Sequence, residues 1–340
     1  MRSSDFSKML GSFLSVYLPS ERNFSKNTIS SYCDTFKLLL QYIKATKGLS
    51  PEKVTVKFLN REFILLFLNW LEQERGCSVS TVNQRLAGIH SFFRYIQIDY
   101  PDLLLECQKI LSIPFRKKPA PAVNYLNATD LRLILEQPDC STRSGRRDLT
   151  LLSLLYDTGG RVQEIADLTV GSLRLQAPAQ IMLVGKGNKS RAVPLMAPTV
   201  QLLEGYLFEN RLNDPNSMAY PLFRNQRKEP LTRAGICYIL KKYAAEARAA
   251  NPHIPQNITP HVFRHSKAMH LLEAGVNIIY IRDILGHVDV STTEVYAKAN
   301  MEMKRAALEK VSHISVGNVP SWATNSDLLS WLNDFGKSLS

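Results

Sequence analysis

A proline- and cation-rich segment near residue 115 places the strongest constraint on how this chain can fold. It reads Pro114-Phe-Arg-Lys-Lys-Pro-Ala-Pro121, with three consecutive cations between prolines. Prolines lack a backbone donor and extend the chain, so no helix is expected to run through this segment. The sequence therefore predicts two domains, residues 1–112 and 125–310, with a basic linker at 113–124 and a tail at 311–340. A solvated spacer with no binding role is the alternative for the linker.

Helical periodicity dominates the first hundred residues. Ser25 is suited to cap a helix that ends at Gly48 and Pro51. A second helix is expected from about Arg61 to Glu74, and a third is expected to be capped by Ser80. The apolar stripe of the first helix has the spacing of one buried helical face, and it consists of Ile29, Tyr32, Phe36, Leu39, Leu40 and Ile43.

Beyond the linker, helices alternate with a short pair of strands. Asn127 is suited to cap one helix, and Leu149 to Tyr156 forms an apolar helix that runs into Asp157-Thr-Gly-Gly160. A helix restarts near Arg161. Gln180 to Val184 and Arg191 to Pro194 read as strands joined by a Gly-Lys-Gly-Asn-Lys turn, and helices resume near Thr199. The predicted fold class is therefore mainly α with a small antiparallel β-sheet (α+β).

Charge favours a polyanionic partner. The formal net charge is +12, and nucleic acid is the leading candidate because neutralising phosphates releases counterions. The five cysteines are far apart and form no C-x-x-C pair, which favours reduced thiols in a cytoplasm over a disulfide or zinc framework. No apolar run approaches the length of a membrane span, and no export signal is visible.

Three local motifs suggest other chemistries but fail on context. Asp157-Thr-Gly159 matches the aspartic-protease tripeptide, yet it follows a helical run and has no second copy. Gly185-Lys-Gly-Asn-Lys-Ser190 lacks the Walker spacing and joins two strands instead of opening a helix. His261 and His265 have the i,i+4 spacing of zinc ligands, but no Glu, Cys or Asp completes a site. The i,i+3 pair of His261 and Arg264 instead presents an imidazole and a guanidinium together.

Six residues of the second half together suit phosphodiester chemistry. Two arginines, a lysine and two histidines can surround and neutralise one phosphodiester, while a tyrosine hydroxyl attacks its phosphorus. No carboxylate cluster for a metal lies beside them in the sequence, so neither a metal nor another cofactor is expected. These candidate catalytic residues are Arg161, Lys186, His261, Arg264, His287 and Tyr296.

In combination, five segments resemble the tyrosine recombinase family, also called the phage integrase family, which includes the bacterial Xer recombinases. The order and separations of these segments fit its catalytic domain from about Tyr125 to Leu308, and the N-terminal helices resemble its SAM-like core-DNA-binding domain. The segments are Thr158-Gly-Gly-Arg-Val-Gln-Glu164, Gly185-Lys-Gly-Asn-Lys-Ser-Arg191, Thr259-Pro-His-Val-Phe-Arg-His265, Leu285-Gly-His287 and Ser291-Thr-Thr-Glu-Val-Tyr296.

The resemblance implies a role for each candidate residue. Arg161 and Arg264 would hold the non-bridging oxygens of the scissile phosphate, since a guanidinium donates two parallel hydrogen bonds and keeps its charge. Lys186 would protonate the departing 5′ oxygen. His261 would assist proton transfer from the tyrosine, and His287 would hydrogen-bond the phosphate. Tyr296 would form a 3′-phosphotyrosyl link, which conserves the phosphodiester's energy without metal or ATP. Glu164 would support Arg161.

Two positions depart from the family pattern, and the tail extends it. Gly160 stands where a larger apolar residue is frequent, and Ala297-Lys298 follows Tyr296 where a Thr-His pair is frequent. In the tail, Thr324 and Asp327 suit a capping box ahead of an apolar stripe. That stripe would dock either on a neighbouring protomer or on its own domain, and it consists of Leu328, Trp331, Leu332 and Phe335.

By this resemblance the chain is a C-shaped, two-domain clamp that encircles duplex DNA and recombines specific sites as a homotetramer, or together with a related recombinase. A transposon, integrative element, plasmid or Xer-like system would use it for integration or transposition, in the cytoplasm and at the nucleoid when DNA-bound. A type IB topoisomerase and a DNA-binding protein without chemistry remain alternatives. Cations expected to contact the DNA are Lys26, Arg85, Arg116, Lys117 and Lys118.

Overall fold

The computed structural model describes residues 4–117, 124–185, 187–286 and 327–338. By its internal contacts the chain divides into two compact units, Met1–Pro121 and Ala122–Ser340. Each unit has a core of its own, and each is described by itself below. None of the helices in the described ranges is both long and apolar enough to cross a membrane.

Over residues 4–117 all regular secondary structure of the first unit is helical, and polar side chains cap its main helices. Ser25 accepts a hydrogen bond from the Thr28 amide at the start of the second α-helix, and Gly48 ends that helix in the left-handed conformation. The helices are α1 (Asp5–Ser12), a π-helix (Phe13–Glu21), α2 (Lys26–Lys47), α3 (Arg61–Gln73), α4 (Val79–Asp99) and α5 (Leu104–Leu111), with short 3₁₀ turns at Pro51–Lys53, Val56–Phe58 and Pro101–Leu103.

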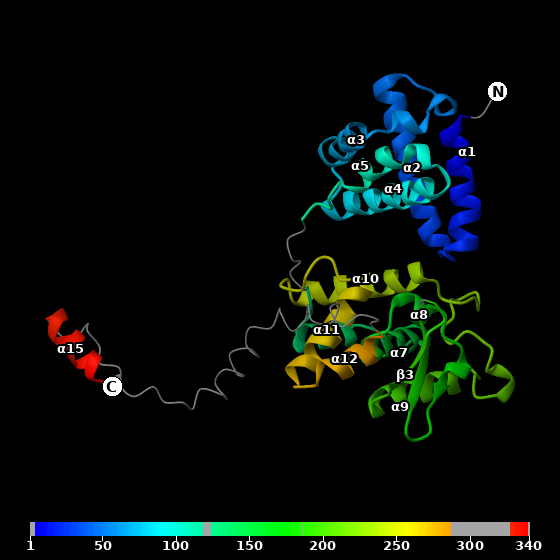
Figure 1. Cartoon of the computed structure of the whole chain (residues 1–340). Helices are drawn as coiled ribbons and strands as arrows, with labels where there is room; N and C mark the ends of the chain where they lie inside the picture. The colour runs from blue at the N-terminus through cyan, green and yellow to red at the C-terminus, as the bar shows by residue number, and fades with distance from the viewer. Residues whose placement is uncertain (1–3, 118–123, 186, 287–326, 339–340) are drawn as a thin grey trace. The chain divides into compact units, whose positions relative to one another are not determined.

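Helices α1, α2 and α4 come together in the centre of this unit (Figure 1). Aromatic side chains fill this centre. The Phe36 and Phe92 rings lie 5.0 Å apart at a steep angle, and the Phe13 ring meets Phe92 at 5.3 Å. Such edge-to-face pairs add to the free energy gained by burying the rings. The stripe predicted for residues 29–43 therefore belongs to the core, with Phe36, Leu39 and Ile43 fully buried.

The second unit surrounds a small sheet with helices. Its three antiparallel strands follow chain order, and Leu183 of the central strand pairs with Arg191 of the edge strand. The strands are β1 (Leu173–Arg174), β2 (Gln180–Val184) and β3 (Ser190–Pro194). The helices are α6 (Ala128–Leu135), α7 (Arg143–Thr158), α8 (Val162–Ala166), α9 (Ala197–Glu209), α10 (Arg233–Ala250), α11 (Pro260–Glu273), α12 (Ile278–Leu285) and α15 (Leu328–Ser338), with 3₁₀ turns at Val170–Ser172 and Pro215–Ser217.

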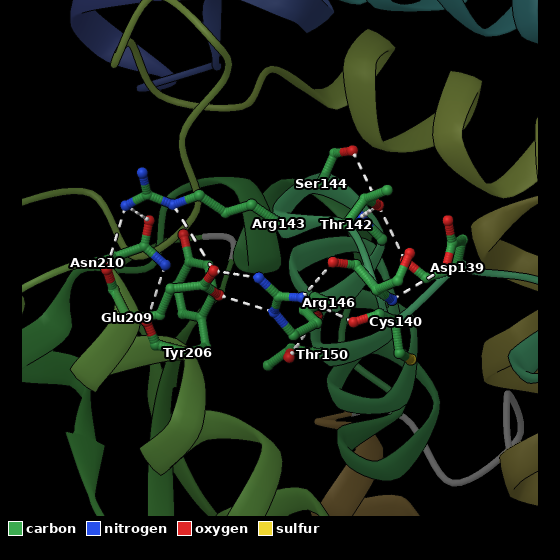
Figure 2. A network of polar contacts seen from close by, with 12 residues as sticks. Asp139, Cys140, Thr142, Arg143, Ser144, Arg146, Thr150, Tyr206, Glu209 and Asn210 are labelled. Carbon is green, nitrogen blue, oxygen red and sulfur yellow. Dashed lines mark hydrogen bonds and ion pairs between the residues drawn. The ribbon is translucent and has the colours of Figure 1, made fainter.

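Polar contacts at both ends fasten the central helix α7 to α9. Near the start of α7 the Arg146 guanidinium binds the Glu209 carboxylate through two hydrogen bonds of 2.5 and 3.2 Å (Figure 2). At the other end Asp157 accepts the backbone N–H of Met196, just ahead of α9, at 3.2 Å. The two helices are therefore antiparallel, and this pairing fixes the C-terminal end of α7, from which the candidate site begins.

The structure confirms the predicted fold class and corrects some of its details. Ser78, not Ser80, caps α4, because the Ser78 hydroxyl is the one that accepts the Thr81 amide. The helix predicted from Leu149 begins earlier, since the Thr142 side chain caps it at the Gly145 amide. Strand β1 was not predicted, because two residues carry no periodic signal.

Candidate active site

The turn between α7 and α8 places Arg161. The left-handed Gly159, with φ of 56°, ends α7, and Arg161 then occupies the extended N-cap position of α8. A Cβ at Gly159 would lie 2.8 Å from the Leu285 side chain, so the chain passes close to the end of α12 here. The close approach brings Arg161 beside a segment more than a hundred residues further along the sequence.

Helix α11 supplies the second arginine and a histidine. Thr259 caps this helix and Pro260 occupies its first turn, where a missing backbone donor costs nothing. His261 lies in the same turn and is exposed, whereas Arg264 on the next turn is buried, with 3% of its surface accessible. The predicted i,i+3 pair is therefore presented at the start of one helix.

The two arginines converge on the same pair of turns. Arg264 donates to the Gly159 carbonyl at 2.7 Å and to the Leu285 carbonyl at 2.6 Å. Arg161 donates to the next carbonyl, that of Gly286, at 3.2 Å. Residues 159–161 and 285–286 thus bring both guanidinium groups together. A cationic pair of this kind can bind the oxygens of one phosphate, because each group presents a planar fork of donors.

The buried carboxylate of Glu164 holds Arg161 in place. Glu164 accepts the Arg161 backbone N–H and the Arg161 guanidinium, each at 2.8 Å. It also accepts two hydrogen bonds from Arg191, of 3.0 and 2.7 Å. Burial alone would raise the pKa of Glu164, but the Arg191 and Arg161 hydrogen bonds outweigh it and hold the pKa below its usual value. Glu164 is therefore an ionised acceptor that fixes the orientation of Arg161.

Positive charge surrounds His261 of α11. Desolvation and then the charges of Arg264, Arg233 and Arg161 lower the pKa of His261 below its ordinary value. A lowered pKa leaves the imidazole neutral at pH 7, in which state it can accept a proton. The pKa of His265 is lowered as well, by desolvation and then by His261 and Arg264.

Sequence reasoning missed two parts of this arrangement. Asp157 forms an ion pair with Lys267 of α11 at 3.1 Å, and so it ties α7 to the helix that carries Arg264. Arg191 was placed on a strand without a role. The signal that marks it is strand alternation: Arg191 and Val193 share the inward face of β3, where a cation requires a partner.

Some of the predicted catalytic and supporting residues lie outside the part of the chain that the structure describes, and the others lie within it. Lys186, His287 and Tyr296 lie outside the described residues. The structure brings together Arg161, Glu164, His261 and Arg264. In the part of the chain that is described, no three His, Cys, Asp or Glu side chains form a group that could hold a metal ion.

The cations predicted to contact DNA lie in several environments within the first unit. Lys26 and Lys117 are exposed, and Lys118 lies outside the described residues.

The two predicted arginines are held by the fold. Arg85 donates to the Ser31 carbonyl at 2.9 Å, which ties α4 to α2. Arg116 pairs with Glu72 and donates to Asn69 at 2.7 Å. Both arginines therefore have structural partners, and their contact with DNA stays a prediction.

Comparisons with known proteins agree on one family. Residues 124–303 match the phage integrase family, and residues 12–97 match the phage integrase N-terminal SAM-like domain. A putative integrase/recombinase of Sinorhizobium fredii, y4rC, is 36% identical over 326 residues, which cover 96% of this chain and 97% of that protein. The tyrosine recombinase XerD of Listeria monocytogenes is 35% identical over 282 residues, covering 82% and 90% of the two chains.

Solved structures share the fold. The XerH site-specific recombinase bound to a palindromic difH substrate matches with a TM-score of 0.67 and 22% identity, over 85% of this chain and 81% of that one. The Tn1549 transposon integrase in complex with a circular intermediate DNA gives the same TM-score at 17% identity, over 88% and 98%. The chain therefore belongs to the phage integrase family and is a Xer-like tyrosine recombinase, an enzyme that cleaves and rejoins DNA at specific sites through a phosphotyrosine intermediate.

Proposed function

We propose that Arg161 and Arg264 bind the scissile phosphate of a duplex recombination site and that Tyr296 attacks it. The observation that carries this proposal is that the two guanidinium groups bind adjacent carbonyls, Arg264 that of Leu285 and Arg161 that of Gly286, while Arg264 also binds Gly159, two residues before Arg161. Donors already oriented by the fold stabilise the charge that develops on the phosphate without having to reorganise. Buried Arg264 and the Glu164-bound Arg161 are oriented in this way.

The other roles follow the order of the reaction. Neutral His261 accepts the proton from the Tyr296 hydroxyl as the oxygen attacks, and a 3′-phosphotyrosyl bond forms while the bond to the 5′ oxygen breaks. Lys186 gives its proton to that departing 5′ oxygen, and His287 hydrogen-bonds the phosphate. Rejoining reverses these transfers with a 5′ hydroxyl of the exchanged strand as nucleophile. The supports are the lowered pKa of His261 and the match of residues 124–303 to the phage integrase family.

At the level of assembly, we propose that residues 1–112 and 125–310 close around one duplex through the basic segment 113–124. Four protomers, or a mixture with a related recombinase, then hold two duplexes and exchange one pair of strands at a time. The net charge of +12 supports a long contact with phosphates. XerH, which has this fold, was solved on its difH substrate. The place of action would be the cytoplasm, at the nucleoid.

A suicide duplex tests this function. A nick next to the cleaved phosphate lets a short fragment diffuse away, so that the covalent complex accumulates and can be counted on a denaturing gel. The wild-type chain is expected to form the complex, whereas Tyr296→Phe should form none and still bind the duplex. Relaxation of a supercoiled plasmid with no requirement for a particular sequence would instead favour a topoisomerase.

A further inference from the structure

Arg191 occupies an unusual position for a cation. It lies on β3 opposite Leu183, on the inward face of the strand, and only 13% of its side chain is exposed. Burying a guanidinium is costly unless a partner compensates its charge. The contacts of this side chain therefore indicate why the fold retains it.

All three donor nitrogens of the Arg191 guanidinium are engaged. The two terminal nitrogens bind the two oxygens of Glu164 at 3.0 and 2.7 Å, which is the bidentate geometry that guanidinium and carboxylate favour. The Nε donates to the Ile284 carbonyl, near the end of α12, at 2.9 Å. A single side chain thus joins β3, α8 and α12.

Glu164 passes this contact on to Arg161. From the described part of the chain this carboxylate accepts two hydrogen bonds from Arg191 and two from Arg161. Only 4% of the Glu164 side chain is exposed, so water has little access to replace a missing donor. Without Arg191, half of the acceptor capacity of a buried carboxylate would be unmet, and its hold on Arg161 would change.

Arg191 also packs against the turn that follows α12. Gly286 adopts a left-handed φ of 65°, and a Cβ there would lie 2.8 Å from the Arg191 Nη1 atom. The sequence places Lys186 five residues before Arg191 and His287 directly after Gly286. The Arg191 contacts therefore lie between three segments that carry proposed catalytic residues.

We propose that Arg191 is a positioning residue for strand cleavage and that it acts on Arg161 through Glu164. This inference rests on the proposed role of Arg161 at the phosphate. The role proposed for Arg191 requires no contact with the phosphate or the tyrosine. Its function is to hold the carboxylate ionised and in one orientation, so that the Arg161 guanidinium has one direction in which to present its free donors.

Single-turnover cleavage of the suicide duplex by the full chain tests this role. Arg191→Ala should slow formation of the covalent complex by about 10- to 100-fold, because small displacements of a catalytic group have effects of this size. Affinity for the duplex should change by less than about threefold. Arg191→Lys should be intermediate, since one ammonium cannot span both Glu164 oxygens and the Ile284 carbonyl.

Arg146→Ala is the matched control. Arg146 also makes a bidentate contact with a carboxylate in the same unit, through its Nε and Nη2 atoms to Glu209 (Figure 2). It lies near the start of α7, whereas Arg161 follows the end of that helix. This variant should lower the unfolding temperature but leave the cleavage rate of the folded protein within about twofold of wild type. Equal cleavage by Arg191→Ala and Arg146→Ala, measured below both unfolding temperatures, would overturn the inference.

Two further readouts separate positioning from simple stabilisation. Adding Arg191→Ala to Glu164→Ala should cost less than about twofold more in rate, because groups acting through one another are not additive. In the single variant Arg191→Ala, burial should raise the pKa of Glu164 above its wild-type value, because the Arg191 hydrogen bonds are lost. The cleavage rate of this variant should therefore rise with pH as Glu164 ionises. The inference would be contradicted if the rate losses of the two substitutions multiplied in the double variant. A pH profile of Arg191→Ala that matches wild type would also contradict it. A wild-type chain that forms no complex would overturn the proposed function itself.

Discussion

The Gly159 carbonyl accepts a 2.7 Å hydrogen bond from Arg264. The two residues are separated by 105 positions, and the bond links the start of α11 to the turn ahead of Arg161. Because the same guanidinium also binds the Leu285 carbonyl, one buried side chain spans the ends of α7 and α12. A residue proposed to bind the phosphate is therefore also part of the framework of its own site.

This double role predicts two losses for Arg264→Lys. One ammonium cannot reach both carbonyls, and a buried acceptor left unpaired costs about 1–3 kcal/mol. Urea unfolding should show this loss, and the suicide duplex should show no covalent complex. Arg248→Lys is the control, since Arg248 also binds backbone carbonyls, those of Ile254 and Pro255, in another part of the unit. Arg248→Lys should be less stable but active. An active Arg264→Lys would contradict the assignment.

Asp157 should prove structural, despite standing in an Asp-Thr-Gly tripeptide. Its carboxylate binds Lys267 at 3.1 Å and the Met196 amide at 3.2 Å, and only 9% of its side chain is exposed. Asp157→Ala leaves the Lys267 ammonium without this partner, and removing one member of a buried pair costs about 3–5 kcal/mol. Asp157→Asn should lose less, because the amide oxygen still accepts from Met196. Equal stability of the two variants in thermal unfolding would refute this account.

His261 should titrate below its ordinary pKa. Desolvation and three neighbouring arginines disfavour the imidazolium, so the ring stays neutral at pH 7 and cleavage slows only as pH falls through the lowered value. The unfolded chain takes up this proton at a higher pH than the folded chain does. Stability due to His261 is therefore complete above the unfolded pKa and decreases as pH falls.

NMR titration of the His261 ring checks this prediction directly. Arg233→Gln should raise the midpoint but not restore the ordinary value, because desolvation is the larger cause. Lys242→Gln, which removes a cation of α10 that is not among the causes of the shift, should leave the midpoint unchanged. A wild-type midpoint above the ordinary histidine pKa would contradict the desolvation and positive charge around His261.

Gly286 should tolerate a side chain less well than Gly275 does. Both adopt left-handed backbone, with φ of 65° and 79°, so alanine adds a similar backbone strain of about 1–2 kcal/mol at each. Only at Gly286 would the new Cβ also collide with Arg191, at 2.8 Å, whereas the space at Gly275 is open. Gly286→Ala should therefore be the less stable in urea and the slower in cleavage. Equal effects would show that Arg191 moves aside freely.

The sequence predicted the elements whose signals are local. Ser25 and Gly48 bound α2 as expected, and Asn127 caps α6, because caps and left-handed glycines act on residues three or four positions away. Where two serines compete, as at Ser78 and Ser80, local pattern does not decide between them. The cap depends on which hydroxyl meets an amide once the helix has formed.

The architecture of the site was only partly predictable. His261 and Arg264 share one helix, so their proximity follows from spacing. The contact of Arg191 with Glu164 joins residues 27 positions apart on different elements, and no periodicity encodes it. Strand alternation shows only that Arg191 points inward and requires an acid. Which acid it meets depends on how α8 packs on β2, and that packing is a property of the folded unit.

The decisive experiment identifies the residue that becomes bound to DNA. The covalent complex from the suicide duplex can be digested with protease and nuclease, and the nucleotide-bearing peptide sequenced by mass spectrometry. A single modified peptide is expected, with a 3′-nucleotide phosphate on the oxygen of Tyr296. A phosphate carried by any other residue, or a complex that persists in Tyr296→Phe, would contradict the proposed role of Tyr296.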